Sequence, residues 1–387
     1  MAAQIPVLNK RRRCASLHGA TNRHVLLHKE KRMTRRLFLG GPDGRSRWAA
    51  RRALNVVFLV ACSIFTAMLF AGHALAAAPQ VGTQAPGFYR MMLGNFEITA
   101  LSDGTHPFPV HKVFTKSSLA DGQSVPLDQS SPGEADALLA ESKLSVPVAG
   151  SINAFLINTG SKLILIDSGA GSLYGDCCGH LIANMRAAGY APEQVDEIYL
   201  THLHADHVGG IAPNGKMAFP NAVVRVSQAD ADYWLKDANE AAAPSLLKSM
   251  FEGDKASLKP YIDAGRFKPF SYGDELAPGI KPIAGPGHTP GHSFFEVESN
   301  GAKLLLWGDV VHVAPMQFPD PAITVAYDSD AGMAESVRLA VFADAAQKGY
   351  WIGAAHISFP GLGHVSAKDG HFFWVPANYD AAPGTGN

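Results

Sequence analysis

The sequence predicts an α/β (α+β) fold in which helices enclose layers of strands. Short apolar runs rich in β-branched residues alternate with segments whose apolar residues recur at helical spacing, and this mixed order is typical of such folds. A chain of 387 residues with this apolar content is long enough for a proper core. No segment that resembles an interdomain linker or an internal repeat interrupts the alternation after residue 78.

Each expected element has a local pattern behind it. The runs at 153–160 and 162–169 are separated by a glycine and a serine, which predicts a hairpin. Apolar residues along one face predict a helix within 180–190. The same reasoning predicts further strands at 197–200, 222–226, 303–311 and 350–357, and helices over 231–240, 244–253 and after residue 329.

Residues 1–77 have the pattern of an export signal. They hold fourteen Lys and Arg against two acidic residues, and an apolar run from Ala53 to about Gly72 is followed by small residues up to Ala77. A basic flank, an apolar centre and an A-x-A ending predict cleavage near Ala77 or Ala78. We therefore expect an export signal region at 1–77 and a mature domain at 78–387, located in the periplasm or secreted.

Other interpretations of this region stay open. The apolar run approaches the length of a membrane-spanning helix, so an uncleaved anchor is an alternative. The stretch "LVAC", ending at Cys62, resembles a lipoprotein signal, although the apolar run continues past it. Further upstream, "TRRLFLGG" from Thr34 resembles the twin-arginine export signal, and Met33 just before it is a possible true start.

The body beyond residue 77 is acidic, with nineteen Lys and Arg against thirty-two Asp and Glu. A surface of this charge repels phosphate backbones, so we expect no nucleic-acid partner. Apart from the export signal, no membrane partner is expected either.

Cys177 and Cys178 are the only cysteines left after the presumed signal. Neighbours in sequence rarely join in an unstrained disulfide, so no disulfide framework is expected. The pair is interpreted as small buried hydrophobic residues, with a soft-metal site as the alternative.

The stretch "THLHADHVGG", 201–210, places three histidines and an aspartate within six positions after an apolar run. Burying so many titratable groups is unfavourable unless a cation binds them. Residues two apart on an extended segment point the same way, so His202 and His204 are expected to hold one ion. Asp206 and His207 follow as the chain turns and are expected to face a second ion.

Three downstream segments offer the remaining ligands at the ends of apolar runs. They are "GPGHTPGH" with His288, "LLLWGDVV" with Asp309 and "GAAHISFPG" with His356. The sequence predicts that His202, His204 and His288 hold one metal, that Asp206, His207 and His356 hold the other, and that Asp309 bridges them. The second histidine of the first segment, His292, is expected to support the site rather than to ligate. Structural or pocket-rim roles are expected for His180, His312, His364 and His371.

These motifs together resemble the metallo-β-lactamase superfamily over roughly Gly87 to Tyr379. "LILIDSG" also fits, with Asp167 where the superfamily usually has a structural acid. "WGDVVHVAPMQFPDP" and the closing "AAHISFPGLGHV" and "FFWVPANY" resemble the methyl parathion hydrolase branch and the related secreted lactonases that act on acyl-homoserine lactones. The resemblance implies an αββα sandwich with a dinuclear zinc-type site at one sheet edge.

An all-nitrogen and oxygen ligand set suits two Zn²⁺ ions, with cobalt, manganese or iron as alternatives. We expect Asp206 and Asp309 to act catalytically with a metal-bound hydroxide, which replaces a Ser or Cys nucleophile. The superfamily's diiron oxygen and nitric oxide reductases usually carry Glu where this chain has His204, so redox chemistry is not expected.

By resemblance, Tyr174, Trp234 and Phe251 are expected near a substrate cleft lined with aromatic residues, although packing in the core explains the last two equally well. Such a cleft suits a small hydrophobic ester, and the expected reaction is hydrolysis of a phosphotriester or a lactone. A thioesterase or a β-lactam hydrolase is the alternative. A non-catalytic metal-binding protein would have lost a ligand, and none is missing. By analogy with the branch, a homodimer is also expected.

Overall fold

The computed structural model describes residues 44–70, 78–117, 124–273 and 275–381. The chain divides into two compact units, Met1–Val81 and Gly82–Asn387. The first contains helix α1 (Gly44–Phe70). Within the part of the chain that the structure describes, no helix is both long and apolar enough to cross a membrane. The twin-arginine-like stretch from Thr34 and the expected cleavage point at Ala77 lie outside the described residues.

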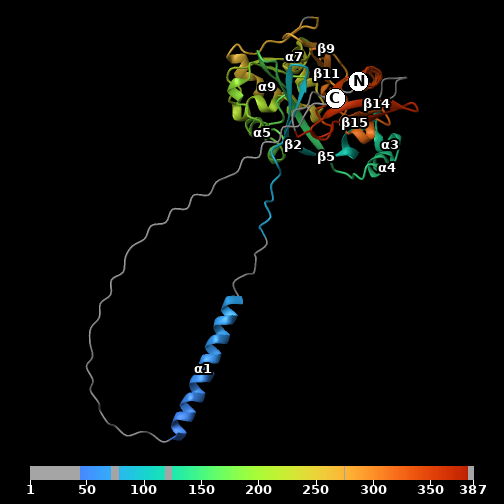
Figure 1. Ribbon diagram of the computed structural model, residues 1–387. Coiled ribbons are helices and arrows are strands. Elements are labelled where there is room, and N and C mark those ends of the chain that lie inside the picture. The colour runs from blue at the N-terminus through green and yellow to red at the C-terminus, as the bar shows by residue number, and fades with distance from the viewer. Residues whose placement is uncertain (1–43, 71–77, 118–123, 274, 382–387) are drawn as a thin grey trace, which may run out of the picture. The chain divides into compact units, whose positions relative to one another are not determined.

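The second unit is built on two six-stranded sheets (Figure 1). The first has the order β1-β2-β5-β6-β7-β8 and the second the order β15-β14-β13-β11-β10-β9. The strands of the first sheet are β1 (Phe88–Leu93), β2 (Phe96–Phe108), β5 (Val148–Asn158), β6 (Leu163–Ile166), β7 (Glu197–Tyr199) and β8 (Val223–Arg225). Those of the second are β9 (Ile280–Ala284), β10 (Ser293–Ser299), β11 (Ala302–Leu306), β13 (Trp351–Gly353), β14 (Leu362–Lys368) and β15 (His371–Pro376).

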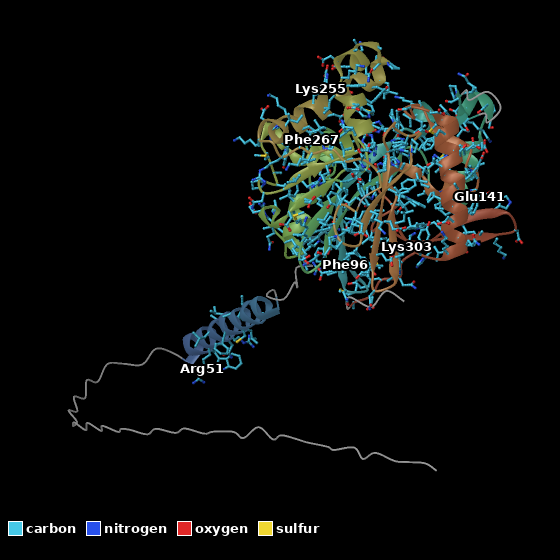
Figure 2. The ribbon with its side chains drawn as sticks, turned by 90° about the horizontal axis from the view of Figure 1, so that it is seen from above. Arg51, Phe96, Glu141, Lys255, Phe267 and Lys303 are labelled. Carbon is cyan, nitrogen blue, oxygen red and sulfur yellow. The ribbon has the colours of Figure 1, made fainter. Side chains whose placement is uncertain are left out.

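Helices cover the outer faces of both sheets. On the first sheet these are α5 (Leu181–Ala187), α6 (Ala205–Val208), α7 (Gln228–Trp234) and α9 (Ser245–Asp263), and α8 (Asp237–Ala242) packs on α7 and α9. On the second sheet the covering helix is α11 (Ala331–Lys348), whose Phe342 packs beneath Trp307. The sheets face one another across a core that includes Phe155, Tyr199 and Phe295. This layering confirms the predicted αββα sandwich, and Figure 2 shows side chains throughout its interior.

A smaller layer lies beside the two main sheets. It consists of a three-stranded sheet in the order β12-β3-β4 with short helices packed on it. Its strands are β3 (Phe114–Ser117), β4 (Ser124–Pro126) and β12 (Ile323–Val325), and its helices are α2 (Val110–Val113), α3 (Leu127–Ser130), α4 (Glu134–Glu141) and α10 (Ala314–Gln317). None of these elements was predicted from the sequence, because the segments are short and their apolar residues follow neither a helical nor a strand spacing.

Local patterns predicted the central elements correctly. The hairpin at 153–169 is β5 and β6, and the helices and strands expected between 180 and 253 are present, except that the helix expected over 231–240 is divided into α7 and α8. The strand expected at 303–311 is shorter, because β11 ends at Leu306 and the chain turns at Gly308. Gly308 has a φ of +56°, and a Cβ there would lie 2.6 Å from His292 Nε2, so glycine is required.

The topology brings several strand ends to one edge. Strands β6 and β7 run parallel in the first sheet, and β11 and β13 run parallel in the second, so the carboxyl ends of each pair coincide. The two sheets are joined at this edge by a hydrogen bond from the Ser293 amide to the Thr201 carbonyl, 2.8 Å long. Polar residues that follow the strands therefore converge without disturbing the apolar interior.

A buried arginine holds the chain that follows Asp309. Arg338 of α11 is 1% exposed and donates to the carbonyls of Val310, Pro321 and Ile323 at 2.6–3.0 Å. Arg338→Met would leave these carbonyls without their donor, so we expect it to lower the free energy of unfolding by about 3 kcal/mol. Urea unfolding measures this loss. The exposed control Arg186→Met is expected to change stability by no more than about 0.5 kcal/mol, and an equal effect of both variants would contradict the prediction.

Candidate metal centre

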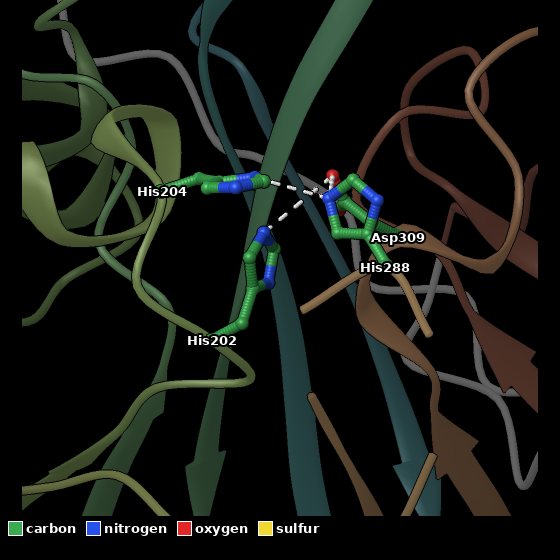
Figure 3. A group of neighbouring side chains, drawn as sticks. All are labelled: His202, His204, His288 and Asp309. Atoms are coloured by element: carbon green, nitrogen blue, oxygen red, sulfur yellow. Dashed lines mark hydrogen bonds and ion pairs between the residues drawn. The ribbon is translucent and has the colours of Figure 1, made fainter. Parts of the chain in front are cut away.

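Seven side chains from five segments converge at the shared edge. His202 and His204 follow β7, Asp206 and His207 lie on the short helix α6, His288 follows β9, Asp309 follows β11 and His356 follows β13. Figure 3 shows His202 and His204 pointing from one side of the centre toward His288 and Asp309 on the other. All seven residues that the sequence predicted as ligands are therefore brought together.

The side chains form two groups that share Asp309. In the first group, Asp309 Oδ2 lies 3.7 Å from His202 Nε2 and 3.3 Å from His288 Nε2. His288 Nε2 also lies 3.0 Å from His204 Nδ1. One donor atom from each of these four residues falls within 4.8 Å of every other, so a single ion can contact them all.

The second group contacts the same Asp309 carboxylate. It contains Asp206, His207 and His356, whose donor atoms also fall within 4.8 Å of one another. His356 Nε2 is 3.5 Å from Asp206 Oδ2 and 3.1 Å from Asp309 Oδ2. His207 Nε2 is 3.1 Å from Asp309 Oδ1. Asp309 thus lies between the two groups, as its predicted bridging position requires.

His312, for which the sequence predicted a structural or pocket-rim role, also faces the centre. It is buried, its Nε2 lies 3.2 Å from Asp309 Oδ2, and its ring stacks on that of His356. Asp309, His312 and His356 form a third group of donor atoms within 4.8 Å of one another. The only sequence signal was its place three residues after Asp309, where one turn of chain brings both side chains to the same side.

Hydrogen bonds orient the histidine rings. His207 Nδ1 donates to Asp167 at 3.0 Å, His288 Nδ1 donates to Asp328 at 2.6 Å, and His356 Nδ1 donates to the Ser151 carbonyl at 2.8 Å. In each case the other ring nitrogen is directed to the centre. Such outer partners fix the tautomer and the direction of metal-binding histidines. Asp167 was predicted as a structural acid, whereas Asp328 was missed because nothing in its local sequence links it to a residue forty positions earlier.

His292 has a supporting role toward Asp309. Its Nδ1 donates to the Gly285 carbonyl at 2.9 Å, and its Nε2 accepts from the Asp309 amide at 3.0 Å. With both nitrogens engaged, His292 has no lone pair left for a metal. It instead holds the backbone that presents the Asp309 carboxylate, in agreement with the sequence interpretation.

The histidines of the centre fall into two electrostatic classes around the Asp309 carboxylate. Burial, together with the nearby His207, lowers the pKa of His202 well below its usual range, and burial with His288 does the same for His204. Burial opposes ionisation of Asp309, but the surrounding His207 and His356 hold its pKa well below the usual value. Burial also lowers the pKa of His207, His288 and His356, but nearby carboxylates, Asp309 among them, outweigh it and raise the pKa of all three rings. The centre therefore combines an anionic carboxylate with two neutral imidazoles and three whose proton affinity is increased.

The residues fit divalent metal ions. The inward atoms His202 Nε2, His207 Nε2 and Asp309 Oδ1 are buried and have no hydrogen-bond partner within the described structure. Buried polar atoms without partners are unfavourable and rare, so these atoms have the environment expected of ligands. Imidazole and carboxylate donors in two groups suit zinc, and cobalt, manganese and iron accept the same donors.

A cavity of about 110 Å³ opens onto the centre. Its walls combine His204, Asp206, Asp309 and His356 with apolar and aromatic side chains, namely Phe108, Val113, Ile152, Met250, Tyr174 and Tyr327. The Tyr174 hydroxyl donates to Asp206 Oδ1 at 3.3 Å. Of the three aromatic residues expected at a substrate cleft, Tyr174 lines this cavity.

The other two aromatic residues lie in the core. Trp234 and Phe251 are fully buried, and their ring centroids are 4.4 Å apart. Neither residue lines the cavity at the metal centre. The helical positions of both residues in the sequence were compatible with a place in the core. Both side chains lie on the inward faces of their helices, α7 and α9. Trp234 instead supports His204, whose ring meets it edge to face at 5.0 Å.

Comparisons with known proteins agree with this geometry. A family model described as the metallo-beta-lactamase superfamily matches residues 147–356, a little over half of the chain. The crystal structure of the hydrolase AbOPH, in the beta lactamase superfamily, is 38% identical, with a TM-score of 0.68 over 77% of this chain and 100% of that one. The dizinc quorum-quenching lactonase AidC is 25% identical, with a TM-score of 0.67 over 76% of this chain and 98% of that one.

Curated relatives include an N-acyl homoserine lactonase from Bacillus cereus, which is 27% identical over 162 residues. These residues make up 41% of this chain and 55% of the relative, so the chain spans about half the length of the curated relatives it matches. The fold, the ligand groups and the family model define the class, and the chain belongs to the metallo-β-lactamase superfamily. Quorum-quenching lactonases are among the proteins it is similar to, and they are one of the two groups that its motifs resemble, the other being the methyl parathion hydrolase branch.

The orientation of His288 by Asp328 predicts a measurable effect. Asp328→Ala removes the carboxylate that fixes the ring, so we expect zinc affinity to fall about 10- to 100-fold. Competition with a chromophoric chelator measures the affinity, and circular dichroism checks that the fold is kept. Asp232→Ala, which removes an exposed carboxylate on α7, serves as the control. Unchanged zinc affinity in a folded Asp328→Ala variant would contradict the assignment.

Proposed function

We propose that this protein is a dinuclear zinc hydrolase that cleaves the ester bond of a lactone, with N-acyl homoserine lactones as its substrate class. The observation that carries the proposal is the pair of donor groups at the base of a largely apolar cavity, with Asp309 in the first group and 3.1 Å from His207 and His356 of the second. An aromatic and aliphatic wall favours a neutral substrate with a hydrophobic substituent. A phosphotriester also has these properties and is a second candidate, supported by the same wall.

The residues that would hold the ions are His202, His204 and His288 in one group and Asp206, His207 and His356 in the other, with Asp309 shared. Divalent cations in such sites supply Lewis acidity, which polarises the bond under attack and makes water a stronger acid near neutral pH. The protein's own side chains hold the centre in place and bind the substrate. Buried carboxylates and imidazoles keep the centre rigid, and the cavity wall orients the acyl portion toward it.

Tyr174 has a further part in substrate binding. Burial, followed by the charge of Asp206, raises the pKa of its hydroxyl well above the usual value, so the group stays protonated and acts as a donor. From the cavity wall this hydroxyl reaches Asp206 Oδ1. The same proton is available to a polar oxygen of a substrate that enters the cavity, which would hold the ester in a fixed orientation.

An assay of the zinc-loaded full chain tests the proposed function. We expect hydrolysis of an N-hexanoyl homoserine lactone, and we expect His202→Ala and Asp309→Ala to lower kcat/KM by about 100-fold or more, because even orienting groups cost 10- to 100-fold when they are lost. Methyl parathion, a thioester and a cephalosporin are measured beside the lactone. Metal content is determined for each variant.

The outcomes of this panel separate the alternatives. Cleavage of the thioester or the cephalosporin, with no action on the lactone or on methyl parathion, would contradict the proposal. Wild-type protein that retains metal and hydrolyses none of the four would indicate a non-catalytic metal-binding protein.

Tyr174→Phe removes a single hydroxyl from the cavity wall. A hydrogen bond of this kind contributes about 1 kcal/mol, so we expect kcat/KM for the lactone to fall roughly fivefold, chiefly through KM. Steady-state kinetics measures the change, and Tyr379→Phe, at an exposed tyrosine, is the matched control. A parallel loss of bound metal would instead assign Tyr174 to the support of Asp206.

A further inference from the structure

Cys177 and Cys178 form a cluster that the proposed hydrolysis does not use. Their Sγ atoms are 2.9 Å apart, and neither is in a disulfide. Cys177 is half-buried, whereas Cys178 is 7% exposed and borders a cavity of about 470 Å³. This larger cavity contains none of the seven predicted metal ligands. The two thiols are thus close to one another, Cys178 lies beside a cavity, and Cys177 is the more exposed of the two residues.

The loop that carries the thiols is fixed on both sides. The buried Asp103 carboxylate accepts hydrogen bonds from the amides of Ala170, Gly179 and Leu181 at 2.9–3.1 Å. Strand β2 passes directly behind Cys177, because a Cβ on Gly104 would lie only 2.0 Å from the Cys177 carbonyl oxygen. The backbone therefore has little freedom to separate the two sulfurs.

Cys177 is also linked to the wall of the metal-centre cavity. Its thiol donates to the Tyr174 carbonyl at 3.4 Å, and its Sγ lies 4.0 Å from His106 Nδ1. The rings of His106 and Tyr174 pack at 5.1 Å, and both residues line the cavity. A displacement of the Cys177 sulfur therefore changes contacts of two wall residues directly.

We propose that Cys177 and Cys178 form a reversible two-electron redox site, which a small organic disulfide oxidises to a disulfide between the two neighbours, and that this closure shifts Tyr174 at the cavity wall. The redox site stands independently of the proposed function, whereas its effect on catalysis rests on that function.

The reaction balances as two exchanges. The Cys177 sulfur attacks one sulfur of the small disulfide, forms a mixed disulfide and releases one small thiol. The Cys178 sulfur then attacks Cys177 Sγ, forms the bond between the neighbours and releases the second small thiol. The two protein thiol protons end on the released thiols, so the protein loses two electrons and the small disulfide gains them.

The exposure of the two cysteines determines which sulfur reacts first. Cys177 is the more exposed thiol, and burial raises the pKa of Cys178, which keeps it protonated until the mixed disulfide has formed. The disulfide between Cys177 and Cys178 is expected to be easily reduced. Neighbouring Cα atoms are about 3.8 Å apart across a trans peptide, below the roughly 4.4–6.8 Å usual for disulfides, and strained disulfides are the labile ones.

The test treats the reduced full chain with bis(2-hydroxyethyl) disulfide and then maps its tryptic peptides by mass. We expect the 163–186 peptide, which holds only these two cysteines, to lose two hydrogens and to regain them with dithiothreitol. Cys178→Ser is expected to stop at the mixed disulfide on Cys177. Cys62→Ser, a cysteine substitution elsewhere in the chain, is expected to behave as wild type in this peptide.

A kinetic measurement on the same samples tests the link to the cavity. We expect closure to raise KM for the lactone several-fold, with recovery on reduction and no such cycle in Cys178→Ser. A 163–186 peptide that keeps both thiols, or that carries only mixed disulfides, would overturn the redox site. Closure with an unchanged KM would overturn the link to Tyr174. Because the mass measurement needs no catalysis, failure of the proposed hydrolysis is distinguished from failure of the redox site.

Discussion

The structure depends on the contact between the Asp309 carboxylate and the imidazoles around it. Five histidine nitrogens lie within 4 Å of its two oxygens, in a region where the side chains are almost completely buried. A carboxylate so enclosed is unfavourable unless positive charge compensates it. The surrounding groups leave it anionic and leave several ring nitrogens without partners, so the arrangement is that of a cation site.

The remainder of the fold serves to hold this cluster in place. Parallel strand pairs in both sheets end at one edge, where the segments after β7, β11 and β13 carry six of the seven candidate ligands, and His288 follows the antiparallel strand β9. Asp167, Asp328 and His292 then fix the rings and the Asp309 backbone from outside the centre. The polar cluster is confined to the edge, so the apolar interior between the sheets remains continuous, and the site and the core are stabilised without conflict.

The loop from Gly171 to His180 contributes to the site features that the metal ligands do not provide. It contributes Tyr174 to the cavity wall, next to Asp206, and it carries the two neighbouring thiols behind that wall. In this superfamily the sheets and the ligands define the general chemistry, whereas loops of this kind define the shape of the cavity. The loop, packed against β2, therefore contributes one residue to the cavity wall and carries the whole of the proposed redox site.

The sequence by itself predicted the α/β class, the central hairpin and the supporting role of His292, implied the αββα sandwich through a family resemblance, and indicated seven candidate ligands that the structure brings together. It could do so because strand ends and histidine spacing are local patterns, and because parallel strand ends must meet. Tertiary structure alone decided that Asp328 orients His288, that His312 faces Asp309, and that Trp234 and Phe251 pack in the core. No repeating pattern in the sequence links the residues that make these contacts. Only the packing of helices and loops brings them together.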